Sequence, residues 1–132
     1  MMENGKLTTS KHDIGNEITV LRVGGYIEYS TSDELDRTLD DLIKENKYNI
    51  ILDLEGVDYI SSRGWSIFLS KIKEIRENKG DLKLTNLNDN VYEVYKVLEF
   101  FWFMKVYDTM ESAINDFIKG VPPMPEDGQT ER

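Results

Sequence analysis

The step Ser61-Ser62-Arg63-Gly64 is the part of this sequence whose residue types and spacing best suit chemistry. It follows an apolar run at residues 50–54 and precedes a helical pattern, so we expect Ser62 to be the N-cap of a helix. A serine there accepts a hydrogen bond from a free backbone N–H of the first turn. The unpaired N–H groups and the dipole of a helix N-terminus also favour a phosphoryl group. A structural cap and a phosphorylation site are both open interpretations of Ser62.

The neighbours of Ser62 would feel such a modification. A phosphoryl group adds roughly 1.5 to 2 negative charges at neutral pH. Arg63 stands next to it and would help to neutralise that charge, and the alternative is a solvated surface arginine. Trp65 comes one residue after Gly64, on the first turn of the expected helix. It is either an exposed anchor for a partner or a core residue packed under the next helix.

Around this step, apolar periodicity predicts alternating strands and helices. Strands are expected over residues 17–26, 50–54, 82–85 and 104–107, with a weaker one over residues 7–14 that is joined to the next by a Gly15-Asn16 turn. Helices are expected over residues 31–46, from Ser62 or Arg63 to Asn78-Lys79-Gly80, from Asn88 or Asp89, and from Asp108-Thr109 to Gly120. This order predicts an α/β fold with a mixed sheet of four to five strands and about four helices.

Several local details follow from the same patterns. Thr31 and Glu34 have the spacing of a capping box at the start of the first helix. The run at residues 50–54 is typical of a strand covered on both faces, and the chain is expected to turn at residues 58–60. The last helix should bury four apolar side chains: Ala113, Ile114, Phe117 and Ile118.

The chain is expected to form one domain. Residues 1–13 would be an N-terminal segment containing an edge strand, and residues 14–119 would be the folded domain. Residues 120–132 contain all three prolines together with polar residues, which predicts a disordered C-terminal tail.

Composition narrows the classes of function. The net charge of -9 and the lack of a dense basic patch argue against binding to nucleic acid or to an anionic membrane. Cysteine is missing from the sequence, which excludes disulfides and thiolate chemistry. The polar N-terminal residues do not resemble a signal peptide, and the longest apolar run, at residues 100–104, is far shorter than the about 20 residues of a membrane span. We therefore expect a cytoplasmic protein.

The apolar run itself, Phe100-Phe101-Trp102-Phe103-Met104, has two interpretations. Four consecutive aromatic residues cannot all face inward from one strand or helix, so some of them would form a contact surface for a partner or for a second copy. Alternatively, the run caps the core. The single histidine, His12, lies in a polar stretch and is expected on the surface, and no metal site or cofactor site stands out in the sequence.

The segment at residues 50–68 resembles the helix-opening motif of STAS domains, the fold of anti-sigma-factor antagonists. In that family an apolar strand and a short loop precede Asp-Ser-Ser/Thr-Gly-Leu, and the serine after the acid is the phosphoacceptor. Ser61 takes the place of the acid, Ser62 that of the phosphoacceptor, Arg63 that of the next hydroxyl residue, Gly64 that of the glycine and Trp65 that of the leucine. Weaker matches at residues 25–28, 79–84 and 107–113 extend the resemblance over residues 14–119.

Besides Arg63 and Trp65 in the motif itself, this sequence departs from the family pattern at three places that concern acids or a glycine. Ser61 replaces the acid before the phosphoacceptor, and Glu28 stands where the family has a second, shorter acid. Glu99 stands where the family usually has a glycine, which serves a left-handed turn after the helix. The first two changes alter the carboxylates that the resemblance places near the acceptor serine.

The resemblance implies a non-enzymatic phospho-switch. Unphosphorylated, the protein would bind an anti-sigma factor that is also a serine kinase. Phosphorylation of Ser62 would release the protein from this kinase, and a PP2C-type phosphatase would reset the switch. The surroundings of the phosphorylation site would be Glu28, Asp58, Ser61, Arg63 and Gly64, and the partner-binding residues would be Trp65, Ser66, Leu69 and Trp102. Because the family docks partners at this helix end, we expect Trp65 to be exposed.

Two other functions remain open. One is a STAS scaffold that binds partners or forms a homodimer without phosphorylation, which the serine at position 61 and the aromatic run favour. The other is a serine hydrolase, which is disfavoured because no base is evidently paired with Ser62.

Overall fold

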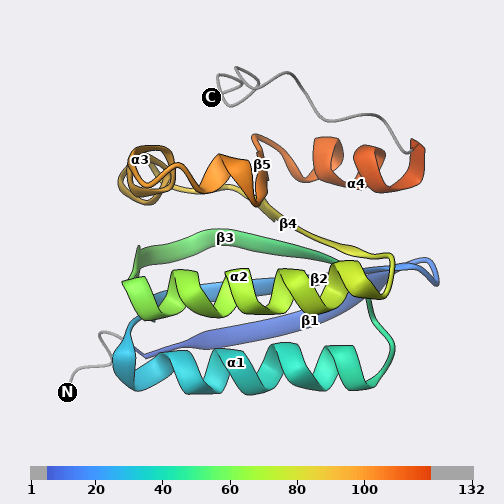
Figure 1. The fold of residues 1–132 in the computed structure, drawn as a ribbon, viewed down its shortest axis with the longest axis horizontal. Coiled ribbons are helices and arrows are strands. Elements are labelled where there is room, and N and C mark those ends of the chain that lie inside the picture. The colour runs from blue at the N-terminus through green and yellow to red at the C-terminus, as the bar shows by residue number, and fades with distance from the viewer. Residues whose placement is uncertain (1–5, 120–132) are drawn as a thin grey trace.

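The computed structural model describes residues 6–119, which form a five-stranded sheet with helices on both faces (Figure 1). The strands are β1 (Thr8–Ile14), β2 (Ile18–Ile27), β3 (Asn49–Ile60), β4 (Asp81–Thr85) and β5 (Lys105–Tyr107). The helices are α1 (Tyr29–Lys44), α2 (Ser62–Glu77), α3 (Asp89–Val97) and α4 (Met110–Lys119), with a short 3₁₀ helix η1 (Phe100–Trp102). The expected α/β fold is confirmed.

The strands lie in the order β1-β2-β3-β4-β5. The first two form an antiparallel hairpin, and every later pair is parallel. The sheet is therefore mixed, as the sequence predicts, and the expected strand over residues 7–14 is present as β1 at one edge. The predicted end of the last helix at Gly120 and the predicted tail of residues 120–132 lie outside the described residues.

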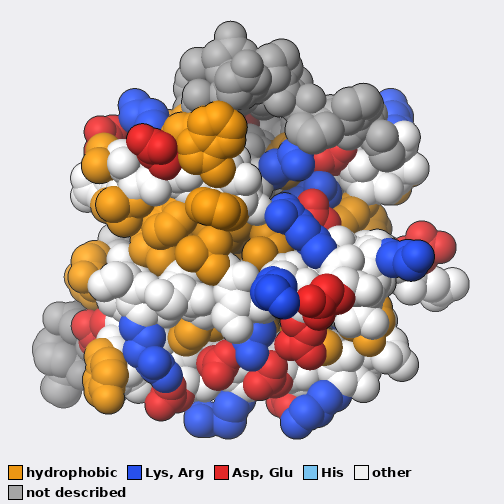
Figure 2. All heavy atoms as spheres, viewed as in Figure 1, with side chains coloured by type: hydrophobic (Ala, Val, Ile, Leu, Met, Phe, Trp, Pro, Cys, Tyr) orange, Lys and Arg blue, Asp and Glu red, His pale blue; other side chains and the backbone are white. Residues whose placement is uncertain are grey.

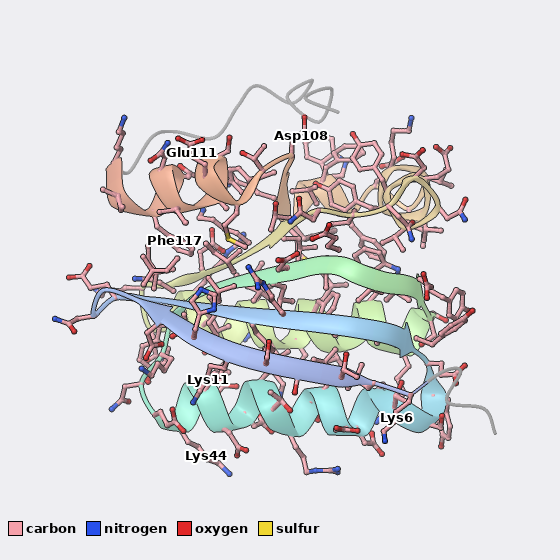
Figure 3. The ribbon with its side chains drawn as sticks, turned by 180° about the vertical axis from the view of Figure 1, so that it is seen from behind. Lys6, Lys11, Lys44, Asp108, Glu111 and Phe117 are labelled. Atoms are coloured by element: carbon pink, nitrogen blue, oxygen red, sulfur yellow. The ribbon has the colours of Figure 1, made fainter. Side chains whose placement is uncertain are left out.

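The main core fills the space between the sheet and helices α1, α2 and α3. The apolar residues that set the helical spacing of α1 are buried: Leu35, Leu39, Leu42 and Ile43. Figure 1 shows α1 and α2 side by side over the same face of the sheet. A smaller core lies on the other face, where Val20 and Ile51 meet Ala113 of α4. In the view from behind, Phe117 points from α4 toward the sheet (Figure 3). The run at residues 50–54 of β3 is thus covered on both faces, as predicted.

Three local predictions are wrong. Strand β3 does not turn at residues 58–60 but continues to Ile60, because it stays paired with β2 through two register shifts beyond Arg22. Helix α1 starts two residues early, so its N-cap is Glu28, whose backbone N–H donates to Thr31 Oγ1 (3.0 Å). Thr31 is thus not the N-cap of a capping box with Glu34. Ile118 is 66% exposed, because α4 contacts the sheet with another face.

None of the helices between residues 6 and 119 combines the length and the apolar character that crossing a bilayer demands.

Candidate functional site

The candidate site forms where β2 and β3 end together. The two strands run parallel, with Ile27 opposite Ile60, and the next residue, Ser61, donates its backbone N–H to the Ile27 carbonyl (2.7 Å). The chain then enters α1 on one side and α2 on the other. This pairing brings the start of α1 beside Ser61 and Ser62.

Ser61, not Ser62, is the N-cap of α2. Ser61 has extended backbone angles (φ -76°, ψ 169°), and its Oγ accepts a hydrogen bond from the Gly64 N–H (3.1 Å). The prediction that Ser62 is the cap is wrong because β3 keeps the chain extended through residue 60, and the cap is the first residue after it. Ser62 is the first helical residue, and it is exposed. Its hydroxyl is therefore not occupied by capping.

Gly64 lets α2 sit against the ends of both strands. A Cβ atom at this position would lie 2.7 Å from Ile27 Cγ2 and 2.9 Å from Ile60 Cγ2, closer than real Cβ contacts. The glycine of the sequence motif thus has a packing reason that fixes the position of Ser62.

Arg63 lies against the first turn of α1. Its Nε donates to Ser32 Oγ (2.9 Å), a second guanidinium nitrogen donates to Asp33, and its Cζ lies 5.7 Å from the centre of the Tyr29 ring. The hydrogen bond that Arg63 donates to Asp33, together with the negative charge of Asp33, raises the pKa of Arg63 above its ordinary value. Arg63 is therefore a surface arginine that is ion-paired and bridges two helices, and its role in neutralising a phosphate stays a prediction.

Two acids border the site from different elements. Glu28 caps α1 and is half-buried, and the Ser30 hydroxyl lies 3.5 Å from its carboxylate. Asp58 is exposed near the end of β3, where the register with β2 shifts. It lines a small hollow of about 70 Å³ together with residues of β3, α2 and α3. The lining residues are Asp58, Tyr59, Ile60, Trp65, Asn90, Val91 and Val94.

Trp65 is only 2% exposed, so the expectation of an exposed anchor is wrong. Its indole stacks on Phe100 (ring centroids 4.8 Å apart, 25° between planes) and meets the edge of Phe68 (5.8 Å). The indole is buried because residues 95–100, which are distant in the sequence, pack over the first turn of α2 and cover the ring. The Trp65 Nε1 finds no hydrogen-bond acceptor among the described residues. Of the other residues assigned to partner binding, Ser66 is exposed and Leu69 is half-buried.

The aromatic run divides between the two expected roles. Phe100 and Phe101 pack on the core and Met104 is fully buried, whereas Trp102 and Phe103 are 65% and 54% exposed. Part of the run therefore caps the core, and part forms an apolar surface. Figure 2 shows hydrophobic side chains gathered between α2 and α3 on one face of the molecule.

The connection before this run keeps the backbone conformation that the resemblance implies. Glu99 has φ 60° and ψ 33°, a left-handed conformation that glycine adopts more easily. The Tyr95 hydroxyl donates to the Met104 carbonyl (2.7 Å) across the turn, and burial raises the pKa of Tyr95.

Sequence reasoning missed three exposed tyrosines at the same end of the molecule. Tyr26 and Tyr59 are paired across β2 and β3, with ring centroids 6.4 Å apart, and Tyr29 opens α1 and is 79% exposed. It also missed Ser32 and Asp33, the partners of Arg63. The position of the tyrosines at the predicted strand ends could have marked them as exposed. That they lie close together could not be predicted without the register of β2 with β3.

These features define an α/β domain in which a serine pair opens the helix that follows the central strand of a mixed sheet. The STAS domain model matches residues 10–113. The chain belongs to the STAS domain family, which confirms the resemblance seen in the sequence.

Known proteins with similar sequences and structures agree with this assignment. A protein named as an anti-sigma factor antagonist, BtrV of Bordetella bronchiseptica, is 31% identical over 117 residues, which cover 89% of this chain and 98% of BtrV. The structure of the anti-sigma factor antagonist SpoIIAA in its unphosphorylated form has a TM-score of 0.71 at 20% identity and covers 88% of this chain and 100% of its own. The phosphorylated form of SpoIIAA from Bacillus has a TM-score of 0.65 at 19% identity, covering 83% and 99%. These two structures share the fold of this chain.

Proposed function

We propose that this protein is an anti-sigma factor antagonist that acts as a phospho-switch at Ser62. The observation that carries the proposal is the exposed Ser62 hydroxyl on the first residue of α2, where Ser61 performs the capping. The Ser62 hydroxyl is thus available for modification without loss of the helix cap. The name of BtrV and the two phosphorylation states of SpoIIAA support the same assignment.

The switch works through charge. An anti-sigma-type serine kinase transfers the γ-phosphoryl group of ATP to Ser62 Oγ, ADP leaves, and the hydroxyl proton passes to solvent. Before this step, the kinase binds the face around Ser62 and releases its sigma factor. After it, roughly 1.5 to 2 added negative charges would have to be desolvated in the contact with the kinase, which costs several kcal/mol and weakens binding by orders of magnitude. A PP2C-type phosphatase that hydrolyses the phosphoester resets the switch.

The surface for the partner surrounds Ser62. Ser66 and Leu69 continue it along α2, and the hollow beside Asp58 lies between α2 and α3. Trp65 also lines the hollow and is only 2% exposed, so it supports this surface from within the core. Glu28, the N-cap of α1, and Asp58, near the end of β3, are the carboxylates that we assign to the surroundings of this site. Such a switch would operate in the cytoplasm, where sigma factors act, and it needs neither a cofactor nor a catalytic residue of this chain.

The test is incubation with an anti-sigma-type kinase from the same genome and ATP, followed by mass spectrometry of the α2 peptide. We expect one phosphate on Ser62, none in Ser62→Ala, and normal modification in Ser70→Ala, which changes an exposed serine of the same helix outside the assigned partner surface. Wild type should bind the kinase at least tenfold more tightly than Ser62→Asp. Equal binding of the two, or phosphate only at another residue, contradicts the proposal.

A second candidate function is a scaffold that binds partners or forms a homodimer without phosphorylation. The observation that favours it is the exposed apolar surface of α3 and η1, formed by Val97, Leu98, Trp102 and Phe103, which are 52–65% exposed. Such a surface would be covered in a complex. Light scattering tests it: a stable dimer that Trp102→Ala dissociates, while Tyr29→Ala does not, would favour the scaffold, and a monomer at all concentrations would exclude the homodimer.

A further inference from the structure

Arg63 connects the residue next to the candidate phosphorylation site with a different helix. Its Nε donates to the Oγ of Ser32, which is fully buried, and another nitrogen of the guanidinium donates to the carboxylate of Asp33. Its cation also lies over the Tyr29 ring. All three contacts belong to the first turn of α1. The first turns of α1 and α2 are therefore joined through one side chain.

We propose that Arg63 exchanges partners when Ser62 is phosphorylated: it leaves the Asp33 carboxylate and binds the phosphoryl oxygens. The inference rests on the proposed function, because it takes Ser62 as the modified residue. A phosphoryl group offers three strong acceptor oxygens and more negative charge than one carboxylate, and a guanidinium can bind two of these oxygens at once.

The existing ion pair is easily exchanged. The side chains of Arg63 and Asp33 are 46% and 61% exposed, and exposed ion pairs of this kind are weakly held in water. Consecutive side chains on a helix do not face each other, so the guanidinium must swing toward Ser62. The exposure of Arg63 leaves room for that movement, and the hydrogen bond from Ser61 to Ile27 keeps Ser62 close to the start of α1.

The exchange would not separate the two helices. Further along the same interface, Lys71 of α2 binds Asp36 (2.7 Å) and Asp40 of α1, and the Lys71 side chain is only 10% exposed. The packing between α1 and α2 therefore persists while their first turns change. Phosphorylation would free the carboxylate of Asp33 and take the guanidinium away from the ring of Tyr29, so that the modification of α2 also changes the surface of α1. Arg63 stands where the family pattern has a hydroxyl residue, and this device is therefore a feature of this chain.

Side-chain nitrogen NMR of the full chain tests the exchange. Phosphoserine is incorporated at position 62 during synthesis, so the result does not depend on a kinase. We expect the Arg63 Nε–H resonance and the Asp33 carboxyl carbon to shift on phosphorylation. Arg76, which pairs with Asp81 at the other end of the same helix (2.9 Å), is the matched control and should not shift. An unchanged Arg63 resonance, or equal shifts of Arg63 and Arg76, would overturn the inference.

Phosphorus NMR gives a second measurement, the pKa of the phosphoserine, which would not change if Arg63 had a purely structural role. A bound guanidinium favours the phosphate dianion, so the second pKa of phosphoserine 62 should be lower in wild type than in Arg63→Ala by about half a unit. Glu28, Asp33 and Asp58 border the site and act in the opposite direction, and Asp33→Asn should lower that pKa further because it removes the competitor. Equal pKa values in wild type and Arg63→Ala would overturn the exchange. A kinase that fails to modify Ser62 would instead contradict the proposed function.

Discussion

The indole of Trp65 stacks on the ring of Phe100, with centroids 4.8 Å apart, although the two residues belong to different helices. Tyr95 lies on the same indole at 6.4 Å, and Phe68 meets it edge-on. This aromatic cluster fastens α3 and η1 to the first turn of α2, which carries Ser62. The position of the candidate site thus depends on residues far along the chain.

Replacement of Trp65 tests this cluster. Trp65→Ala should lower the free energy of unfolding by about 3–5 kcal/mol, because it leaves a cavity in the core. Trp65→Phe should cost clearly less, since it keeps an aromatic ring and removes an N–H that has no acceptor within residues 6–119. Urea denaturation measures both. Trp102→Ala is the control and should change stability by less than about 0.5 kcal/mol, because Trp102 is 65% exposed. A Trp102 effect as large as that of Trp65 would contradict this assignment of the core.

Gly64→Ala tests how tightly α2 packs on the strand ends. The added methyl group would meet Ile27 Cγ2 and Ile60 Cγ2 at less than 3.0 Å, so these side chains must shift. Overpacking of this kind costs about 1–3 kcal/mol, partly offset by about 1 kcal/mol because alanine favours a helix more than glycine. We expect a net loss in thermal or urea denaturation. The control is Ser66→Ala, an exposed change in the same helix. A more stable Gly64→Ala protein would show that the strand ends yield freely.

Local patterns in the sequence predicted most elements of the fold. The spacing of apolar residues in α1 and α2 and the continuous apolar run in β3 correspond to the buried faces that the structure shows. Asn88 caps α3 as one of the two expected residues, since its side chain accepts from the Val91 N–H (2.8 Å). These features depend on neighbours in the sequence, and a single sequence contains that information.

The details of the candidate site were harder to predict because they depend on pairing between distant segments. Which serine caps α2 is decided by where β3 stops, and this follows from the register of Ile27 with Ile60. The burial of Trp65 depends on the return of Phe100. The contact of Arg63 with Asp33 requires α1 and α2 to be neighbours on one face of the sheet. None of these relationships leaves a periodic signal in the sequence.

Lys71 should make stability depend on alkaline pH. Burial lowers the pKa of Lys71, but its hydrogen bonds to Asp36 and Asp40 outweigh this and raise the pKa above 10.5. The charged form is thus favoured by folding, so this stabilisation is complete below about pH 10.5 and is lost as the pH rises through the higher pKa of the folded state. We expect Lys71→Met to lose stability at pH 8 and to show a smaller further loss toward pH 11.5 than wild type.

Urea denaturation across this pH range measures the effect, with Lys73→Met as the control. Lys73 pairs with Glu77 on the surface of the same helix, and both side chains are more than 60% exposed. Its removal should change neither stability nor the pH profile measurably. If Lys71→Met and wild type lost stability in parallel between pH 8 and pH 11.5, Lys71 would not be the source of the dependence.

Ser61 offers a prediction that separates its structural role from its place in the family pattern. Ser61→Ala should lower the free energy of unfolding by about 1 kcal/mol, because the Gly64 N–H loses its acceptor. Ser61→Asp should be as stable as wild type, since aspartate is an equally good N-cap, and it restores the acid that precedes the phosphoacceptor in the family. Under the proposed function, Ser61→Asp should also be phosphorylated at Ser62 faster than wild type by the same kinase. Ser70→Asp, which adds the same charge at an exposed position further along α2 and outside the assigned partner surface, serves as the control and should not be faster. If Ser61→Asp keeps its stability but Ser62 is modified more slowly, then the serine at position 61 is itself an adaptation of this site to its kinase.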